Sequence, residues 1–155
     1  MRLLLIGCTG FVGKELVPSL IKQNHEIFII SRKSINNLKL NIDIKKFKYL
    51  KIDLSKEKSW KSENLINILK EIDGVINLAG EPIADQKWTI SQKQTIENSR
   101  INTTKFLMRT LKECKINPKV IINGSAIGYY GTSLSKEFNE NSPGGNDFLA
   151  NLCKR

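Results

Sequence analysis

Three glycines near the start of the chain, Gly7, Gly10 and Gly13, have the residue type and spacing that a phosphate-binding turn requires. The apolar run Leu3 to Ile6 precedes them and helical spacing follows, so strand, turn and helix come in the order of a dinucleotide phosphate site. In such a site one glycine makes the tight turn, one lets the backbone approach a pyrophosphate, and one lets the helix pack on the strand. The helix N-terminus then stabilises the anion without a basic side chain.

The spacing of this motif is wider than the Gly-x-Gly-x-x-Gly of many dehydrogenases. A glycine-rich turn without a ligand is therefore the alternative for the motif in isolation. The strand before it and the helix after it favour the phosphate site.

The residues that follow the second apolar run could select the cofactor. This run predicts a strand over Glu26 to Ser31, and its end reads Ser31-Arg32-Lys33. At this position an acidic residue accepts hydrogen bonds from the ribose 2′-hydroxyl of NAD, whereas Arg accommodates the 2′-phosphate of NADP. A hydroxyl followed by two cations suits a phosphomonoester, so the sequence predicts NADP, with NAD less favoured and ordinary loop cations as the alternative.

Alternating strands and helices must place these residues at one edge of a sheet. Further strands are predicted from Lys45 to Lys51, ending near Leu54, from Gly74 to Gly80 and from Val120 to Ser125. Helices are predicted after Gly13, from Leu65 to Ile72, from Ser91 to Cys114 and from Asp147 to Arg155. This α/β alternation predicts a doubly wound parallel sheet, the Rossmann fold, with strand order 3-2-1-4-5 in one domain spanning residues 1–155.

The composition of the 155 residues excludes several classes of protein. No apolar stretch approaches the roughly 20 residues of a membrane span, and no signal-peptide pattern precedes the glycine motif, so we expect a cytoplasmic protein. The three cysteines lie far apart, which favours neither a disulfide framework nor a metal site. The net charge of +10 comes mostly from scattered lysines, and the cluster at Lys45 to Lys51 alternates as a half-solvated strand does, so we expect no nucleic-acid partner.

With these elements placed, the chain resembles the extended and atypical short-chain dehydrogenase/reductases, and more narrowly the NAD-dependent epimerase/dehydratase family of the SDR39U1 or YfcH type. Ordered stretches carry this resemblance over nearly the whole chain: Asn77-Leu78-Ala79-Gly80-Glu81-Pro82-Ile83, Lys87-Trp88, Ser99-Arg100-Ile101-Asn102-Thr103-Thr104, Gly124-Ser125-Ala126-Ile127-Gly128-Tyr129-Tyr130-Gly131 and Asp147-Phe148-Leu149-Ala150. The ordered set is more specific than any one motif.

The resemblance implies NADP lying across the C-terminal ends of the strands. Leu78 and Ala79 would offer backbone and apolar contacts, with core packing as the alternative. Arg100 would reach a phosphate or the ribose, with a surface helix cation as the alternative. The residues assigned to the cofactor are Gly7, Thr9, Gly10, Phe11, Val12, Gly13, Ser31, Arg32, Leu78, Ala79, Gly80 and Arg100.

The resemblance also implies catalytic residues, because the wider superfamily uses a Tyr as acid/base, a Lys that lowers its pKa, a Ser and often an Asn. Ser125 matches the Ser and Asn102 matches the Asn. The Tyr-x-x-x-Lys pair is expected in the helix after Pro143, yet that helix contains no tyrosine. Tyr129 or Tyr130 could substitute as the acid/base, with aromatic packing or substrate contact as the alternative.

Two hypotheses for the function follow from this pattern. One is an NADP-dependent epimerase or reductase acting on a small molecule such as a nucleotide sugar. The other is a non-catalytic NADP-binding or regulatory module, to which the cell-division-inhibitor label of some relatives would belong. The resemblance implies that family members continue into a further strand and a small substrate domain. A third hypothesis is therefore that the chain is a truncated, inactive fragment. The apolar edge at Val120 to Asn123 would then be exposed and could form a homodimer.

Overall fold

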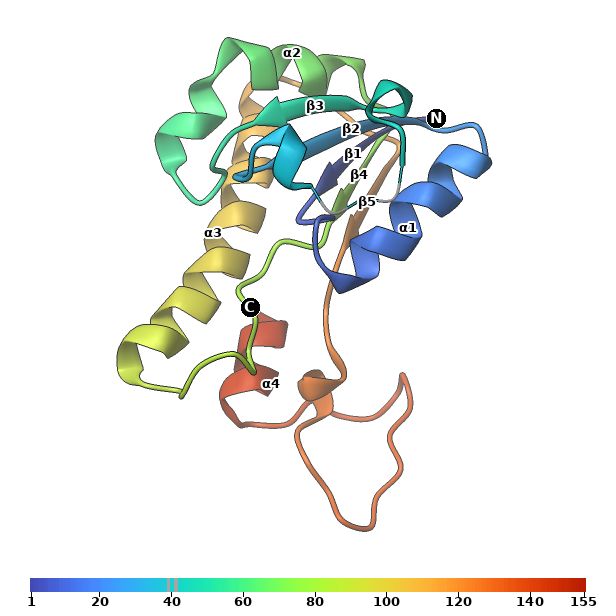
Figure 1. Cartoon of the computed structure of the whole chain (residues 1–155). Helices are drawn as coiled ribbons and strands as arrows, with labels where there is room; N and C mark the ends of the chain where they lie inside the picture. The colour runs from blue at the N-terminus through green and yellow to red at the C-terminus, as the bar shows by residue number, and fades with distance from the viewer. Residues whose placement is uncertain (39, 41) are drawn as a thin grey trace. The chain divides into compact units, whose positions relative to one another are not determined.

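The apolar runs of the sequence form a five-stranded parallel sheet with the order β3-β2-β1-β4-β5 (Figure 1). Its strands are β1 (Arg2–Ile6), β2 (Glu26–Ser31), β3 (Lys48–Lys51), β4 (Gly74–Asn77) and β5 (Val120–Asn123). Each pairs in parallel with its neighbours, for example Leu4 with Phe28 on one side and Val75 on the other. The predicted doubly wound fold and strand order are therefore confirmed.

The computed structural model describes residues 1–38, 40 and 42–155. The chain divides into two compact units, Met1–Asn123 and Gly124–Arg155, and each is described by itself. The first unit holds the sheet and its covering helices, and the second holds a loop with one short helix.

One face of the sheet packs against α1 (Phe11–Lys22). Leu3 and Leu5 of β1 face this side because side chains of a strand alternate between the two faces. Val17 of α1 is buried among them, with Leu16, Leu20 and Ile21 packed around it. The apolar spacing read from the sequence thus becomes the buried side of this helix.

The opposite face packs against α2 (Glu63–Glu71) and α3 (Ile90–Glu113). Leu4 and Ile6 of β1 contribute to this second core, together with Leu65 and Leu69 of α2 and Leu107 and Leu111 of α3. Figure 1 shows these helices on one side of the sheet and α1 on the other. Both faces of the central strands are covered, which explains their continuous apolar sequence.

The prediction for the third strand was wrong at its beginning. Instead of starting at Lys45, β3 starts at Lys48, because Ile44–Lys46 forms a short 3-10 helix. The side chain of Asp43 caps this helix by accepting a hydrogen bond from the Lys45 backbone N–H at 2.9 Å. A local hydrogen bond from an Asp side chain competes with strand pairing in this way.

The fourth and fifth strands are shorter than predicted. β4 ends at Asn77 rather than Gly80, and β5 ends at Asn123 rather than Ser125. At Asn77 the side-chain oxygen accepts a hydrogen bond from the Ala79 backbone N–H at 3.1 Å, which turns the chain out of the strand. The residues expected to be the ends of these strands are therefore in loops.

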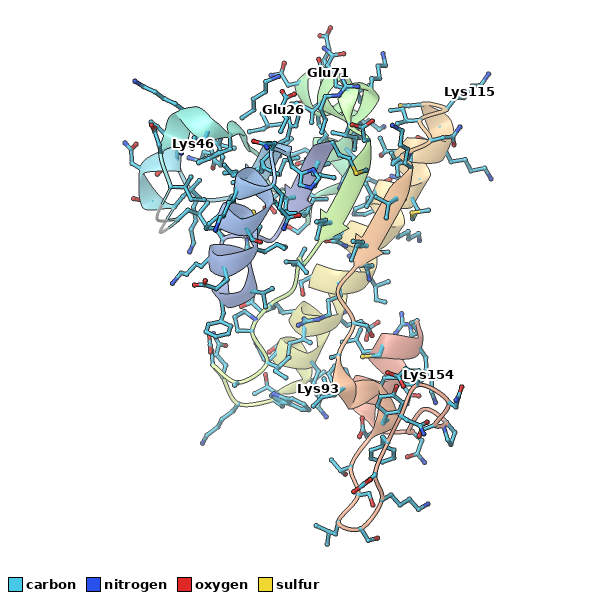
Figure 2. The ribbon with its side chains drawn as sticks, turned by 90° about the vertical axis from the view of Figure 1, so that its right-hand side faces the viewer. Glu26, Lys46, Glu71, Lys93, Lys115 and Lys154 are labelled. Atoms are coloured by element: carbon cyan, nitrogen blue, oxygen red, sulfur yellow. The ribbon has the colours of Figure 1, made fainter. Side chains whose placement is uncertain are left out.

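Charged side chains gather at the amino ends of the strands. Lys48 pairs with Glu26 at 2.7 Å, and Lys119 pairs with Asp73 at 3.1 Å. Figure 2 labels Glu26 and Glu71 at this end of the sheet. Ion pairs thus lie at the amino ends of the strands, whereas the glycine turn lies at their carboxyl ends.

The second unit contains a 3-10 helix, Ile127–Tyr130, and α4 (Phe148–Lys154). Asp147 caps α4 by accepting a hydrogen bond from the Ala150 N–H at 2.8 Å. Gly131 has a φ of +76°, and its backbone lies against Gly145. Between the 3-10 helix and α4, residues 131–146 form loops and turns.

Candidate functional site

A cavity of about 250 Å³ lies at the carboxyl ends of the strands in the first unit. Parallel sheets bind ligands at these ends, where the loops leave the strands. The residues that line the cavity come from the turns after β1 to β4 and from α3: Ile6, Gly7, Thr9, Gly10, Ile30, Ser31, Arg32, Lys33, Ile52, Asp53, Leu54, Ser55, Leu78, Ala79, Gly80, Glu81, Ser99 and Thr103.

The turn after β1 lines the cavity with the backbone of two glycines, which carry no side chain. Gly7 has a φ of +75°, and a Cβ there would lie 2.5 Å from the Ala79 nitrogen, so no other residue fits. Gly10 is the N-cap of α1, and its Cβ position is open, with the nearest atom 3.9 Å away. The first helical hydrogen bond runs from Lys14 N to Gly10 O, so the N–H groups at this end are the ones a helix leaves for an anion.

Four of the predicted cofactor residues lie outside the cavity lining, and three of them are in the first turn of α1. Phe11 and Val12, in the first turn of α1, are 90% and 59% exposed. Gly13 is buried against Cys8 and supports the helix rather than lining the cavity. The motif is therefore divided: Gly7, Thr9 and Gly10 line the cavity, and Gly13 brings α1 onto β1.

The tip of β2 supplies the basic side of the cavity. Ser31, Arg32 and Lys33 all line it. The Ser31 hydroxyl oxygen accepts a hydrogen bond from the Lys33 backbone N–H at 3.2 Å, which closes a tight turn around Arg32. The hydroxyl proton of Ser31 and the guanidinium of Arg32 are donors of the kind that bind phosphate oxygens.

The end of β3 adds an acidic residue that the sequence did not single out. Asp53 accepts hydrogen bonds from the N–H and the hydroxyl of Ser55, at 3.1 and 2.7 Å. Burial raises the pKa of Asp53, but the Ser55 hydrogen bonds and the charges of Arg32 and Lys56 outweigh burial and lower it below 3.8. The carboxylate is thus ionised at neutral pH and lies in the electrostatic field of Arg32.

The loop after β4 is fixed from α3. The Ser99 hydroxyl accepts a hydrogen bond from the Glu81 N–H at 2.9 Å, and Arg100 Nη1 donates to the Glu81 carbonyl at 3.0 Å. The Arg100 guanidinium also covers Gly80, where a Cβ would lie 2.7 Å from Cζ. Leu78, Ala79 and Gly80 line the cavity, whereas Arg100 holds the loop and is not among the lining residues.

The predicted Asn102 lies on α3, half-buried, next to the lining residue Thr103. A different asparagine, Asn77, is the one buried here: its Nδ2 donates to Asn123 Oδ1 at 2.7 Å and to Thr104 Oγ1 at 3.2 Å. These bonds tie β4, β5 and α3 together below the cavity. Asn102 itself does not line the cavity.

The other predicted catalytic residues belong to the second unit. Ser125 is exposed. Tyr129 and Tyr130 meet edge to face with ring centres 5.1 Å apart, and Tyr130 stacks on Phe138 at 5.4 Å. Both tyrosines therefore pack in an aromatic cluster of this unit, and their catalytic role stays a prediction.

Metal-ligand clusters and thiols are two further features that could carry chemistry. Among residues 1–38, 40 and 42–155, no group of three or more His, Cys, Asp and Glu side chains could hold a metal ion. Burial raises the pKa of the Cys8 thiol to about 12, so this thiol stays protonated and packs as a small apolar group. No helix in the same residues has the length and apolar content to cross a membrane.

The sequence matches a known protein family over most of its length. The profile of the NAD dependent epimerase/dehydratase family matches residues 3–147. The chain belongs to this family. The resemblance drawn from the sequence motifs is thereby confirmed, and the glycine turn of this epimerase/dehydratase family member lies within the matched residues.

Curated relatives of this family member are longer than the chain. It is 35% identical to the chloroplastic SDR39U1 homolog of Arabidopsis thaliana, an epimerase family protein, over 99% of this chain and 42% of that protein. It is 37% identical to the epimerase family protein YfhF of Bacillus subtilis, over 99% of this chain and 47% of that protein. The chain thus spans less than half the length of these relatives.

Solved structures share the fold of this family member. The human epimerase family protein SDR39U1, crystallised with NADPH, superposes with a TM-score of 0.72 and 27% identity, over 99% of this chain and 46% of that one. A UDP-galactose 4-epimerase superposes with a TM-score of 0.76 over 99% of this chain and 48% of that one, and at 16% identity this similarity concerns the fold alone.

Proposed function

We propose that this chain binds a nicotinamide dinucleotide in the cavity at the carboxyl ends of its strands. The pyrophosphate would lie on the turn from Gly7 to Gly10, where the backbone is bare and the N-terminus of α1 begins. The single observation that carries this proposal is that the glycine turn and the basic tip of β2 line one cavity. The human relative crystallised with NADPH supports the same class of ligand.

Within this proposal NADP is the preferred cofactor. Ser31, Arg32 and Lys33 offer a hydroxyl and two cations at the place where a 2′-phosphate would lie. The carboxylate at this side of the cavity, Asp53, lies just after β3 and accepts hydrogen bonds from Ser55. A dianionic phosphate gains more from the two cations than a neutral hydroxyl does, so the preference follows from charge.

A calorimetric titration tests the proposal. NADP and NAD are titrated into the protein at one fixed salt concentration, because phosphate binding depends on ionic strength. We expect tighter binding of NADP, and Arg32→Ala should remove most of the difference between the two cofactors. Binding of neither cofactor would refute the dinucleotide site, and equal affinities would refute the NADP preference alone.

For the chemistry we propose an epimerase or reductase acting on a nucleotide sugar, which rests on membership of the family. Ser125 would orient the substrate oxygen, Asn102 would assist it, and Tyr129 or Tyr130 would transfer the proton. A free phenol, with a pKa of about 10, is a weak base at neutral pH, so the acid/base role is the least supported part of this proposal.

A second candidate is a non-catalytic NADP-binding module. The sequence of α4 favours it, because Phe148 and Leu152 stand where a proton-transferring side chain would be expected, and Ala150 lies four residues before Lys154. Two assays separate the candidates: epimer formation from a panel of nucleotide sugars in the presence of NADP⁺, and transfer of deuterium from [4-²H]NADPH to the keto forms of these sugars. Either activity, if lost in Ser125→Ala, supports the enzyme, and tight NADP binding without both activities supports the module.

A further inference from the structure

The turn that carries Arg32 is held by a side chain from the neighbouring strand. Tyr49 lies in β3 and pairs with Ile29 of β2. Its phenol hydroxyl donates a hydrogen bond to the carbonyl oxygen of Lys33 and lies 3.4 Å from the carbonyl oxygen of Ser31. The hydroxyl therefore contacts the backbone on both sides of Arg32.

The ring of Tyr49 is itself anchored. It packs against the apolar core on the α1 face of the sheet, the face that holds Ile27, Ile29 and Phe47. The pairing of Tyr49 with Ile29 fixes the backbone position from which the side chain starts. Because only two rotatable bonds orient the tyrosine ring, the ring has few alternative positions. Burial raises the pKa of Tyr49 above 10, although the Ser31 contact lowers it in part, so the hydroxyl remains a donor at neutral pH.

Other bonds leave the turn little freedom. The Ser31 carbonyl also accepts the Ile52 N–H at 3.0 Å, and the Ser31 hydroxyl accepts the Lys33 N–H. The backbone at Ser31 and Lys33 is thus fixed by these hydrogen bonds and by Tyr49, and the side chains of Arg32 and Lys33 are exposed. Tyr49 is not among the residues that line the cavity, so its effect on a ligand must pass through this turn.

We propose that Tyr49 is a positioning residue for cofactor selection: its hydroxyl holds the Ser31–Lys33 turn so that Arg32 faces the 2′-phosphate of NADP. This inference rests on the proposed NADP site. Loss of the hydroxyl frees the turn and lowers the population in which Arg32 meets the phosphate. NAD lacks that phosphate, so its binding through the glycine turn does not depend on Tyr49.

The test is a double-mutant cycle with Tyr49→Phe, Arg32→Ala and the double variant, each titrated with NADP and NAD by calorimetry at one salt concentration. Tyr49→Phe keeps the ring and removes only the hydroxyl. Loss of one such hydrogen bond should weaken NADP binding about fivefold and leave NAD within about twofold of the wild-type value. With Ala at position 32, the further change Tyr49→Phe should leave NADP affinity within about twofold.

NAD affinity is the internal control for folding. Equal weakening of NADP and NAD by Tyr49→Phe, or a variant that no longer folds, would assign Tyr49 a structural role and overturn the inference. An unchanged NADP affinity would overturn it as well, while the NADP site itself would stand. A wild-type protein that binds neither cofactor, or that binds NAD more tightly, refutes the NADP site first and this inference with it.

Discussion

Gly13 lies so close to Cys8 that a Cβ at position 13 would come within 1.7 Å of the Cys8 carbonyl oxygen. This contact sets how near α1 approaches the end of β1. No side-chain rotation can relieve it, because the Gly13 backbone fixes the position of the Cβ and the atom it would meet is a backbone oxygen. The third glycine of the motif is therefore required by packing.

Gly13→Ala should destabilise the fold, because α1 must move away from the sheet. We expect the free energy of unfolding to fall by about 3 kcal/mol or more. Urea unfolding followed by circular dichroism measures this change. A stability equal to that of the wild type would show that the helix shifts without penalty and would contradict the packing role.

Gly10→Ala is the matched substitution in the same motif with the opposite expectation. Its Cβ would meet nothing closer than 3.9 Å, so stability should stay within about 1 kcal/mol of the wild type. The methyl group would project where the pyrophosphate is proposed, so binding of NADP and NAD should weaken together, by about tenfold or more. Calorimetry that finds unchanged affinity for both cofactors would place the phosphates elsewhere.

Arg100→Ala should lower stability in the absence of any cofactor. The guanidinium donates to the Glu81 carbonyl at 3.0 Å and to the Ile96 carbonyl at 3.2 Å, so it fixes the loop after β4. We expect a loss of about 1–2 kcal/mol in the cofactor-free protein. If Arg100 served only as a cofactor contact, thermal unfolding of the cofactor-free variant would match the wild type.

The central strands and the glycine turn could be predicted because buried parallel strands are continuous apolar runs. Leu3 to Ile6 and Ile27 to Ile30 have this pattern, and each ends at a residue that lines the cavity. The beginning of β3 could not be predicted, because the alternation of Lys45 to Lys51 does not reveal that Asp43 captures the Lys45 N–H.

The contributions of Asp53 and Tyr49 depend on the sheet as a whole. An Asp that ends a strand is common in turns, and only the position of β3 beside β2 brings Asp53 near Arg32. The Tyr49 hydroxyl reaches Lys33 because of the register between Ile29 and Tyr49. One signal in the sequence could have indicated Asp53. It follows the predicted third strand, and the carboxyl ends of neighbouring parallel strands lie at the same edge of a sheet.

Asp73 should make stability depend on acid pH. Hydrogen bonds from the Arg2 N–H and from Lys119 lower the pKa of Asp73 below 3.8 in the folded state, and this outweighs desolvation. A lowered folded-state pKa gives stability that is present above the unfolded pKa and is lost as the pH falls through the folded value. Asp73→Asn should therefore lower the urea midpoint at pH 7 and lose its effect below that folded value.

Asp85→Asn is the control for this experiment, because Asp85 is exposed in the loop between β4 and α3. It removes the same charge, and its urea midpoint should follow the wild type at every pH. A constant difference between wild type and Asp73→Asn across the acid range would mean that the amide disturbs packing and that the charge of Asp73 is irrelevant.

The outer edge of β5 should drive association of two copies. β5 is the last strand in the sheet order, and Val120, Ile121 and Ile122 are 37%, 37% and 51% exposed. An apolar edge strand offers backbone donors and acceptors to another chain, and a lysine on such an edge opposes pairing. We expect light scattering to give the mass of a dimer for the wild-type protein, and the dissociation constant of the Ile122→Lys dimer to be at least about tenfold higher.

Ile44→Lys is the matched control, since Ile44 is 57% exposed and lies just before β3 at the opposite edge of the sheet. A wild-type monomer, or equal dissociation in both variants, would exclude β5 as the contact.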